Sequence, residues 1–303
     1  MARRTARRSK AKLRLGISGP AGSGKSMSSL LMAYGITGDW SKITVIDTEN
    51  NSADLYADYD HNGIQIGVFN VCPISTPYTP EKYIAAIKEC EGAGDEVIII
   101  DSLTHAWAGE GGLLDKKGQI EKSGRPGVNS WTAWRDITPM HNRLVESILT
   151  SKCHIIATLR AKMEHVQEKD PSTGKTVVRK IGMNPIQRDG MEYEFTVFID
   201  VDQDHNATSS KDRTSLVDGL VFRPGVDTGK SFLAWLETGV DIPEPKPEPV
   251  NWGSFWANVQ KLGYSQDEVH TIAGVESIKD WSRDKATELF NKLKAMKQEG
   301  KHE

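Results

Sequence analysis

The stretch that decides the fold is Gly19-Pro20-Ala21-Gly22-Ser23-Gly24-Lys25-Ser26, which fits the spacing G-x-x-x-x-G-K-[S/T]. This composition is typical of a phosphate-binding loop. Its glycines let successive backbone N–H groups turn toward a phosphate, its lysine reaches the terminal phosphates, and its hydroxyl ligates magnesium. We therefore expect all eight residues to contact a nucleotide, with Lys25 also acting in catalysis and Ser26 holding Mg²⁺.

The residues on either side have the pattern that such a loop requires. Residues 13–18 alternate apolar side chains with polar or small ones, as a short strand would. Residues 27–34 are compatible with a helix and place Leu30, Leu31 and Tyr34 at helical spacing. Strand, loop and helix in this order bring the phosphates to a helix N-terminus, where free N–H groups and the helix dipole favour anions.

Composition limits the class of protein. The chain has 303 residues, of which 38% are hydrophobic and 26% charged, and a net charge of −3. This length suits one full domain with a smaller appendage. Because no apolar run approaches the roughly 20 residues that span a bilayer, and the N-terminus lacks a signal-peptide core, we expect a cytoplasmic protein without membrane contact. Three isolated cysteines, Cys72, Cys90 and Cys153, favour reduced thiols over disulfides or a zinc site.

Two later apolar runs end in carboxylates. Residues 42–49 end in Asp47-Thr48-Glu49, and residues 97–102 end in Asp101-Ser102. Both ends should lie near the phosphate loop, because parallel sheets place their ligands at the carboxyl ends of strands. Asp101 then has the position of the acid that holds magnesium. Since Ser102 rather than an acid follows it, the base that activates the attacking water must come from elsewhere, and Glu49 is the best-placed candidate.

These residues carry a family resemblance. The run Ile46-Asp47-Thr48-Glu49, its continuation over residues 53–57, and residues 99–103 resemble the ATPase core of the RecA recombinases. Over residues 13–240 the chain looks more closely like the RecA-like, AAA-family ATPases of phages, including the Sak-type single-strand annealing proteins. The resemblance implies hydrolysis of ATP with Mg²⁺, binding of single-stranded DNA, and assembly into a homo-oligomeric ring or filament. It assigns Lys25 and Ser26 to the phosphate loop, Glu49 to water activation and Asp101 to magnesium.

Further candidates for the nucleotide site follow. Residues 154–160 form another apolar run, and its polar end makes Thr158 or Arg160 a candidate sensor of the terminal phosphate, where the RecA family usually has a glutamine. Lys211 and Arg213 resemble lysine and arginine pairs that reach a neighbouring subunit's phosphates in RecA-like proteins. Arg188 is a weaker candidate for that role, and an ordinary charged loop is the alternative for both segments.

Two basic segments are candidates for contact with nucleic acid. Residues 109–131 read as a long glycine-rich loop and residues 161–185 as a second loop or a hairpin, and their positions resemble the two DNA-binding loops of the recombinases. Trp131 is equally suited to stacking on bases and to core packing, whereas Trp134 is better explained by the core. A hairpin with ordinary solvated charge is the alternative for the second segment. The candidate DNA contacts are Lys116, Lys117, Lys122, Arg125, Lys162, Lys175, Arg179 and Lys180.

The chain divides into four parts. Residues 1–12 form a basic arm without acidic residues, expected to be disordered until it meets a polyanion, or else a solubilising tail. Residues 13–241 are the RecA-like ATPase core. Residues 242–251 are a stiff, proline-rich linker. Residues 252–303 are a module of three or four helices that could bind DNA, a single-strand-binding protein or a neighbouring subunit, with Gly263 as a helix stop and Ser265 as an N-cap.

The sequence thus predicts an α/β, RecA-like P-loop NTPase fold, a parallel sheet flanked by helices, followed by a small helical domain. The predicted function is an ATPase, stimulated by DNA, that promotes single-strand annealing or recombination for a phage in its bacterial host. The alternative is a nucleotide-switched helicase loader or assembly factor acting on a replication protein, although Ser102 after Asp101 argues against the usual loader architecture. A small-molecule kinase would need a substrate pocket and a lid arginine cluster that we do not identify.

Overall fold

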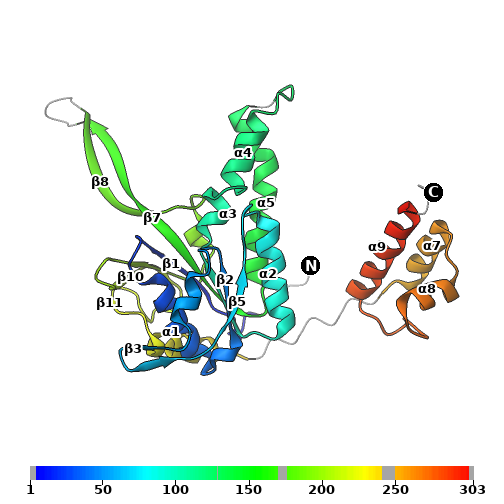
Figure 1. The fold of residues 1–303 in the computed structure, drawn as a ribbon, viewed down its shortest axis with the longest axis horizontal. Helices are drawn as coiled ribbons and strands as arrows, with labels where there is room; N and C mark the ends of the chain where they lie inside the picture. Colours follow the sequence, from blue (N-terminus) through cyan, green and yellow to red (C-terminus); the bar gives the residue numbers. More distant parts are fainter. Residues whose placement is uncertain (1–4, 128, 170–175, 241–249, 300–303) are drawn as a thin grey trace. The chain divides into compact units, whose positions relative to one another are not determined.

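The computed structural model describes residues 5–127, 129–169, 176–240 and 250–299. These residues belong to two compact units, Met1–Asp241 and Ile242–Glu303. The first unit is built on a nine-stranded sheet, and the described part of the second is helical (Figure 1). None of the described helices is both long and apolar enough to cross a membrane.

The sheet of the first unit is mixed and mostly parallel. Its strand order is β11-β10-β9-β1-β7-β6-β2-β5, and β8 pairs with β7 alone. The six strands from β9 to β5 run parallel, whereas β10 and β11 add an antiparallel edge. The strands are β1 Arg14–Gly19, β2 Ile43–Asp47, β5 Asn70–Pro73, β6 Val97–Asp101, β7 His154–Lys169, β8 Thr176–Pro185, β9 Val197–Val201, β10 Ala207–Asp212 and β11 Val221–Phe222.

Helices cover both faces of this sheet, which confirms the predicted α/β fold of a P-loop NTPase. One apolar cluster joins the sheet to α1 (Lys25–Thr37) and α6 (Val226–Leu236), and the other joins it to α2 (Pro80–Ala93) and α5 (Ser130–Thr150). Val97 and Ile99 belong to the first cluster, whereas Ile98 and Ile100 belong to the second. The continuous apolar run of β6 therefore follows from burial on both faces.

Two glycines set the close packing of α1 against α6. A Cβ added to Gly35 would lie 2.0 Å from the carbonyl oxygen of Val226, and one added to Gly229 would lie 2.1 Å from that of Met32. Neither distance is possible for a real side chain, so the backbones of the two helices approach each other only because both positions are glycine. This contact fixes α1, whose first turn follows the phosphate loop.

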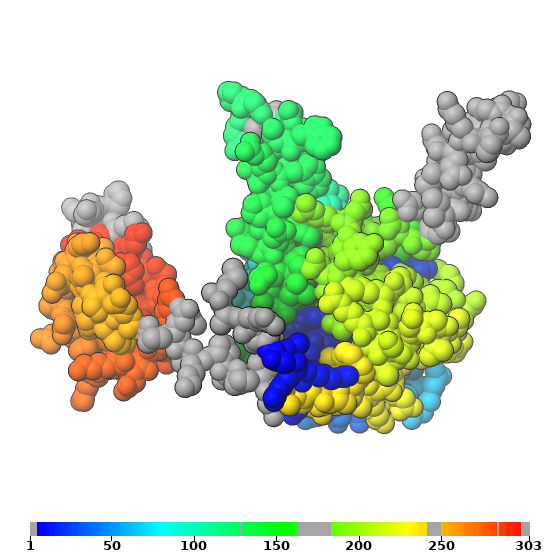
Figure 2. Space-filling model, turned by 180° about the vertical axis from the view of Figure 1, so that it is seen from behind, coloured from blue at the N-terminus to red at the C-terminus, as the bar shows by residue number. Residues whose placement is uncertain are grey.

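The expectation of a long loop over residues 109–131 was wrong. The helices α3 (Thr104–Ala108) and α4 (Leu113–Glu121) lie before and within this segment, and α4 runs alongside α5. Leu113 and Ile120 are at helical spacing and pack with Trp107, Trp134 and Ile137 in a small apolar cluster of their own. We call α4, together with the N-terminal part of α5 that packs against it, the α-arm. It stands out from the body of the first unit (Figures 1 and 2).

The second basic segment is a hairpin, as one of the two alternatives predicted. Beyond its pairing with β1 and β6, β7 continues from Ala161 to Lys169 as the antiparallel partner of β8. We call this extension the β-arm, and it projects on the same side of the unit as the α-arm (Figure 1). A separate small hairpin of β3 (Tyr59–His61) and β4 (Ile64–Ile66) turns at Asn62 and Gly63, which both have positive φ.

The part of the basic arm that the structure describes, residues 5–12, makes contacts with the C-terminal end of the first unit. Ser9 forms a parallel bridge with Val240, and the guanidinium of Arg8 lies 4.3 Å above the ring centroid of Trp235. Lys10 N–H donates to the carbonyl of Val240 at 3.0 Å. These contacts join the described part of the arm to the first unit, because an arginine can stack on the face of a partly buried tryptophan.

The described part of the second unit consists of α7 (Trp252–Leu262), α8 (Gln266–Ala273) and α9 (Arg283–Glu299). Its core joins the three helices through Phe255, Val259, Val269 and Leu293. The two predicted boundary signals are present: Gly263 ends α7 at a φ of 88°, and Ser265 caps α8 with a capping box.

Candidate nucleotide-binding site

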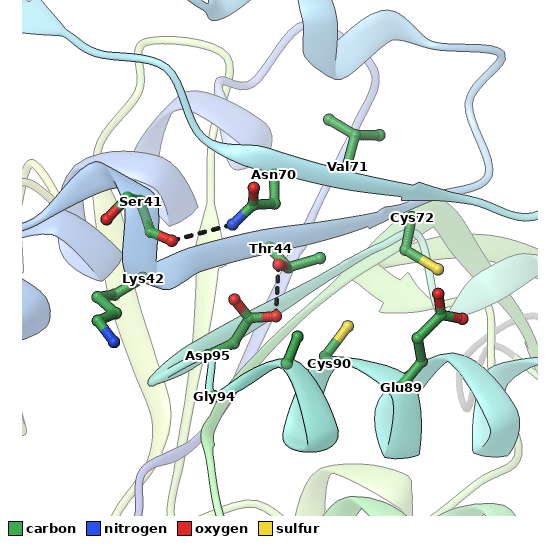
Figure 3. A pocket seen from close by; sticks show the side chains of 11 residues that line it. Ser41, Lys42, Thr44, Asn70, Val71, Cys72, Glu89, Cys90, Gly94 and Asp95 are labelled. Carbon is green, nitrogen blue, oxygen red and sulfur yellow. Dashed lines mark hydrogen bonds between the residues drawn. The ribbon is translucent and has the colours of Figure 1, made fainter.

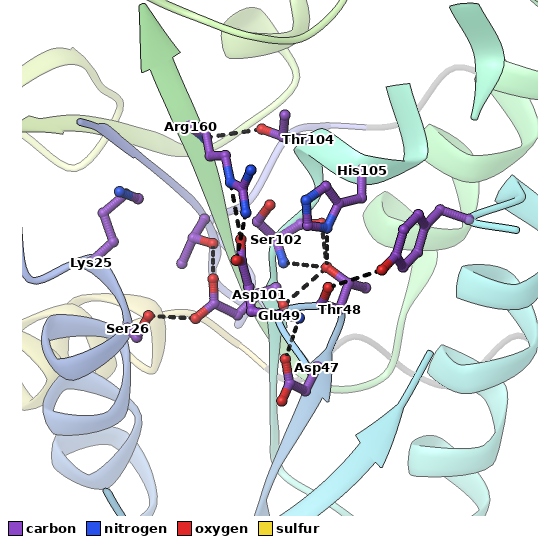
Figure 4. A network of polar contacts seen from close by, with 12 residues as sticks. Lys25, Ser26, Asp47, Thr48, Glu49, Asp101, Ser102, Thr104, His105 and Arg160 are labelled. Atoms are coloured by element: carbon purple, nitrogen blue, oxygen red, sulfur yellow. Dashed lines mark hydrogen bonds and ion pairs between the residues drawn. The ribbon is translucent and has the colours of Figure 1, made fainter. Parts of the chain in front are cut away.

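The predicted nucleotide residues meet at the carboxyl ends of neighbouring parallel strands. The phosphate loop follows β1, Arg160 lies in β7, Asp101 ends β6, and Glu49 follows β2 (Figure 4). Since β7 lies between β1 and β6, it stands between the phosphate loop and Asp101. The strand order thus brings together side chains that are far apart in the sequence.

The phosphate loop has the backbone that its glycines predict. Gly22 and Gly24 have φ values of 77° and 84°, which favour glycine, and Gly24 is the N-cap of α1. Lys25 Nζ donates to the carbonyls of Gly19 and Pro20 at 3.0 and 2.7 Å. Burial lowers the pKa of Lys25, although Asp101 and Glu49 oppose this. The side chain of Lys25 is therefore folded back onto the phosphate loop.

Asp101 is a buried carboxylate held by two hydroxyl groups. The hydroxyl of Ser26 donates to its Oδ2, and Thr158 Oγ1 donates to its Oδ1 at 2.5 Å. Only 6% of Asp101 is exposed, and burial raises its pKa while these two hydrogen bonds and Lys25 oppose the change. Of the two predicted sensors, Thr158 thus contacts Asp101.

This donor set fits Mg²⁺. A carboxylate and a hydroxyl side by side are the oxygen ligands that Mg²⁺ prefers, and it commonly binds through one or two protein groups plus substrate phosphates. Among the described residues, no cluster of three or more His, Cys, Asp or Glu side chains could hold a metal. Ser26 and Asp101 would therefore share the ion with the nucleotide rather than enclose it.

Arg160, the other predicted sensor, forms an ion pair with Glu49. Its Nε donates to Glu49 Oε1 at 3.1 Å and its Nη2 to Oε2 at 2.5 Å. The arginine side chain is 47% exposed and the glutamate side chain 26%. Because both carboxylate oxygens accept hydrogen bonds from one guanidinium, the pair is bidentate.

A partly buried polar network that the sequence did not reveal surrounds Thr48, the residue before Glu49. Thr48 Oγ1 accepts a hydrogen bond from Ser102 N–H at 2.9 Å and lies 2.7 Å from His105 Nδ1. His105 stacks on Tyr78, whose hydroxyl donates to the Thr48 carbonyl at 3.3 Å. Burial, and then Arg160, lower the pKa of His105, which favours its neutral form. These contacts fix the backbone from which Glu49 projects.

A cavity of about 610 Å³ opens beside the phosphate loop. Its walls come from the first turn of α1, from η2 (Ser52–Tyr56), from the β3–β4 hairpin and from the turns around His205 and Arg223. Aromatic and polar side chains, among them Tyr56, Tyr59 and Asn62, line it. The size and position suit a nucleoside attached to phosphates in the loop. The β3–β4 hairpin was not predicted, although the Asn62-Gly63 pair is a sequence signal from which it could have been found.

A second pocket, of about 430 Å³, has no such relation to the loop. It lies between β2, β5 and the C-terminal end of α2, with Cys72, Cys90 and Glu89 on one side (Figure 3). Thr44 Oγ1 donates to Asp95 Oδ2 at 2.5 Å in its wall. Since Thr44 is near the amino end of β2, this pocket lies away from the strand ends that carry Asp101 and Glu49.

Most of the described cations predicted to contact DNA on the α-arm have acidic partners within the chain. Lys116 pairs with Glu81 at 3.2 Å, Lys117 with Glu121, and Arg125 with Asp136 at 2.8 Å. Lys122 on this arm and Lys162 on the β-arm are exposed. Lys175 and the side chains of Arg179 and Lys180 lie outside the described residues.

The two tryptophans of the α-arm differ in their surroundings. Trp131 is 86% exposed in the first turn of α5. Trp134 stacks on Trp107 with ring centroids 5.9 Å apart and packs in the cluster at the root of the arm. Trp134 is therefore a packing residue, as favoured from the sequence, whereas Trp131 is open to a partner.

The predicted pair of cations, Lys211 in β10 and Arg213 directly after it, does not reach the phosphate loop of its own chain. Lys211 lies opposite Phe198, which pairs with Gly16, three residues before Gly19. Lys211 Nζ donates to the carbonyl of Tyr193, and Arg213 is exposed. Arg188 instead donates to Thr138 Oγ1 at 3.3 Å and lies over the Trp134 ring. A role for Lys211 and Arg213 in a neighbouring subunit stays a prediction.

Comparison with known families agrees with this geometry. A family model described as an AAA domain matches residues 11–233, which is most of the first unit. The chain belongs to the AAA domain family. Membership supports a nucleotide-binding ATPase of the P-loop type, in line with the strand, loop and helix around Lys25. No curated protein matches the sequence of this AAA domain protein.

Proposed function

We propose that this AAA domain protein is a Mg²⁺-dependent ATPase that binds single-stranded DNA and promotes annealing or recombination. The observation that carries the proposal is the meeting of Lys25, Ser26, Asp101 and Glu49 at one edge of the sheet, from which two arms also project. Each group has a chemical task in phosphoryl transfer, and such active sites work mainly by positioning and charge stabilisation.

In this proposal the chain's own groups bind and orient the nucleotide. The N–H groups of residues 21–26 hold the phosphates, and Lys25 leaves the carbonyls of Gly19 and Pro20 to reach the terminal phosphate. Ser26 and Asp101 would hold Mg²⁺, which would supply positive charge against the phosphates. Glu49 accepts a proton from the attacking water. The nucleoside occupies the cavity beside Tyr56.

The arms are the proposed contact with a single strand. Trp131 offers an exposed indole on which a base can stack, and Lys122 and Lys162 offer exposed cations for the phosphates. The internal ion pairs of Lys116, Lys117 and Arg125 make these three weaker candidates than the sequence suggested. Shape and stacking, more than charge density, therefore support the DNA-binding part of the proposal.

Assembly and partners belong to the same proposal. Arg213 is exposed and too far from its own phosphate loop to act there, which suits a role in a neighbouring subunit of a ring or filament. The helical unit of residues 250–299 is a candidate site for a single-strand-binding protein. A phage origin, and action in the cytoplasm of an infected bacterium, rest on the resemblance to phage ATPases alone.

The test is the rate of ATP turnover by the full chain with Mg²⁺, with and without a single-stranded oligonucleotide of mixed sequence, read beside particle size. We expect turnover that the oligonucleotide raises, and binding that weakens as salt increases in proportion to the few phosphates that the arms contact. Lys25→Ala should lose ATP binding, whereas Lys230→Gln, which removes an exposed ion pair on α6, should change nothing. Turnover that responds to a replication protein but not to DNA would instead support the helicase-loader alternative.

A further inference from the structure

One residue, Arg160, joins both arms to Glu49. Its backbone N–H donates to Thr104 Oγ1 at 2.9 Å, at the first residue of α3, which leads into the α-arm. Its carbonyl accepts a hydrogen bond from Ile186 N–H at 2.7 Å, directly after β8 of the β-arm. Its guanidinium holds both carboxylate oxygens of Glu49 (Figure 4). A shift at the root of either arm therefore acts on the residue that pairs with Glu49.

A second connection to Glu49 runs through α3 itself. His105 lies 2.7 Å from the hydroxyl of Thr48, the residue before Glu49. Two residues further along the same short helix, Trp107 stacks on Trp134 of α5. Since α3 has only five residues, a displacement of α5 that moves Trp107 also moves His105. The α-arm is thus linked to Glu49 through α3 in two ways, by Thr104 with Arg160 and by His105 with Thr48.

The observed ion pair does not suit a general base. A base must bring an oxygen to within hydrogen-bond distance of the water that it activates, and the guanidinium of Arg160 lies along both oxygens of Glu49, so that the carboxylate faces the arginine rather than a water. The pair is partly exposed, so it stabilises only weakly the arrangement in which Arg160 holds Glu49. A ligand that binds better when Glu49 is free of Arg160 can therefore shift the equilibrium toward the unpaired glutamate.

We propose that Arg160 is a positioning residue that restrains Glu49, and that a single strand bound to the arms releases it. The inference rests on the proposed function, because it takes Glu49 as the base and the arms as the DNA contacts. Arg160 then acts on the carboxylate and not on the terminal phosphate. In this proposal, DNA stimulates ATP turnover because it separates the Glu49 side chain from its partner Arg160.

The test compares ATP turnover of the full chain with and without a mixed-sequence single-stranded oligonucleotide. Arg160→Gln should raise the DNA-free kcat about fivefold, which corresponds to a restraint of about 1 kcal/mol, and should reduce the ratio of DNA-stimulated to DNA-free turnover. Arg160→Lys keeps one charged hydrogen bond but not the bidentate pair, so it should fall between Arg160→Gln and the unchanged chain. Affinity for a fluorescent ATP analogue checks that each variant is folded.

Two results would overturn the inference. A loss of turnover with and without DNA in Arg160→Gln and Arg160→Lys, with nucleotide affinity retained, would place Arg160 at the phosphate. Unchanged basal rate and unchanged stimulation would show that the ion pair restrains nothing. Failure of the proposed function looks different: the unchanged chain would not respond to DNA, or Glu49→Gln would hydrolyse ATP as fast as the unchanged chain.

Discussion

Asp101 and Glu49 stand at the ends of adjacent strands, yet the structure holds them in opposite ways. Asp101 is 6% exposed, and its oxygens accept hydrogen bonds from the uncharged hydroxyls of Ser26 and Thr158. Glu49 is partly exposed and its oxygens are held by the charged Arg160. Neutral donors leave the charge of Asp101 available for a cation. Under our proposal, in contrast, the charged Arg160 must leave before Glu49 can act, so that one carboxylate stays in place while the other changes partners.

The largest expected effect separates the two carboxylates. Asp101→Asn and Glu49→Gln should each lower ATP turnover by at least about 10²-fold, the lower end of what a positioned acid or base contributes. Nucleotide binding should distinguish them: Glu49→Gln should bind Mg²⁺-ATP as the unchanged chain does, whereas Asp101→Asn should lose the dependence of binding on Mg²⁺. Titration of a fluorescent ATP analogue with and without Mg²⁺ measures both. Equal Mg²⁺ dependence in the two variants would contradict the assignment.

The melting temperature of the nucleotide-free chain provides a second test of how Asp101 is held. Burial raises the pKa of Asp101 above its unfolded value, so the stability that this shift contributes is present at low pH and lost as the pH rises through the folded pKa. Asp101→Asn removes that buried charge, and its melting temperature at neutral pH should exceed that of the unchanged chain. Calorimetry without nucleotide or Mg²⁺ measures this, and a lower melting temperature would mean that the hydroxyl donors outweigh burial.

A smaller effect tests the neutral donors themselves. Thr158→Val keeps the shape of the side chain but removes its hydrogen bond to Asp101, so the free energy of unfolding should fall by about 1–3 kcal/mol. Thr208→Val, at an exposed position of β10, is the matched control and should stay within about 0.5 kcal/mol. Urea unfolding at neutral pH measures both. Equal effects in the two variants would show that the bond to Asp101 contributes nothing.

The last test concerns the root of the α-arm, where α5 packs on Trp107. Burial lowers the pKa of His141, which packs on Trp107, from 6.5 to about 4. A lowered histidine pKa contributes stability above the unfolded value that is lost as the pH falls toward the folded one. The free energy of unfolding should therefore decrease from pH 6.5 to pH 4, and less so in His141→Phe. Identical pH profiles from urea unfolding would contradict this.

The sequence allowed prediction of the parts that local chemistry determines. The strand, loop and helix around Lys25 follow from glycine spacing and apolar periodicity, and the buried β6 follows from its continuous apolar run. Gly263 and Ser265 marked helix ends for the same reason. Helix α4 was missed because its glycine and lysines outweighed two apolar residues at helical spacing, Leu113 and Ile120.

Contacts across the sheet could not be predicted in this way. The pair of Arg160 and Glu49 depends on which strands lie between β1 and β2, and nothing local to either residue encodes that order. His105 was missed because a lone histidine after an apolar strand has no distinguishing pattern, and its partner Thr48 is 57 residues away. The positions of site residues were therefore predictable, but their partners were not.

The bridge between Ser9 and Val240 brings the two ends of the first unit together. A short peptide could join them, and new ends could be opened elsewhere, because chains whose termini are adjacent tolerate such rearrangement well. The exposed tip of the α-arm, near Gly124, offers a place for the new ends. Such a circular permutant would keep the nucleotide site in one chain while cutting the connection between α4 and α5.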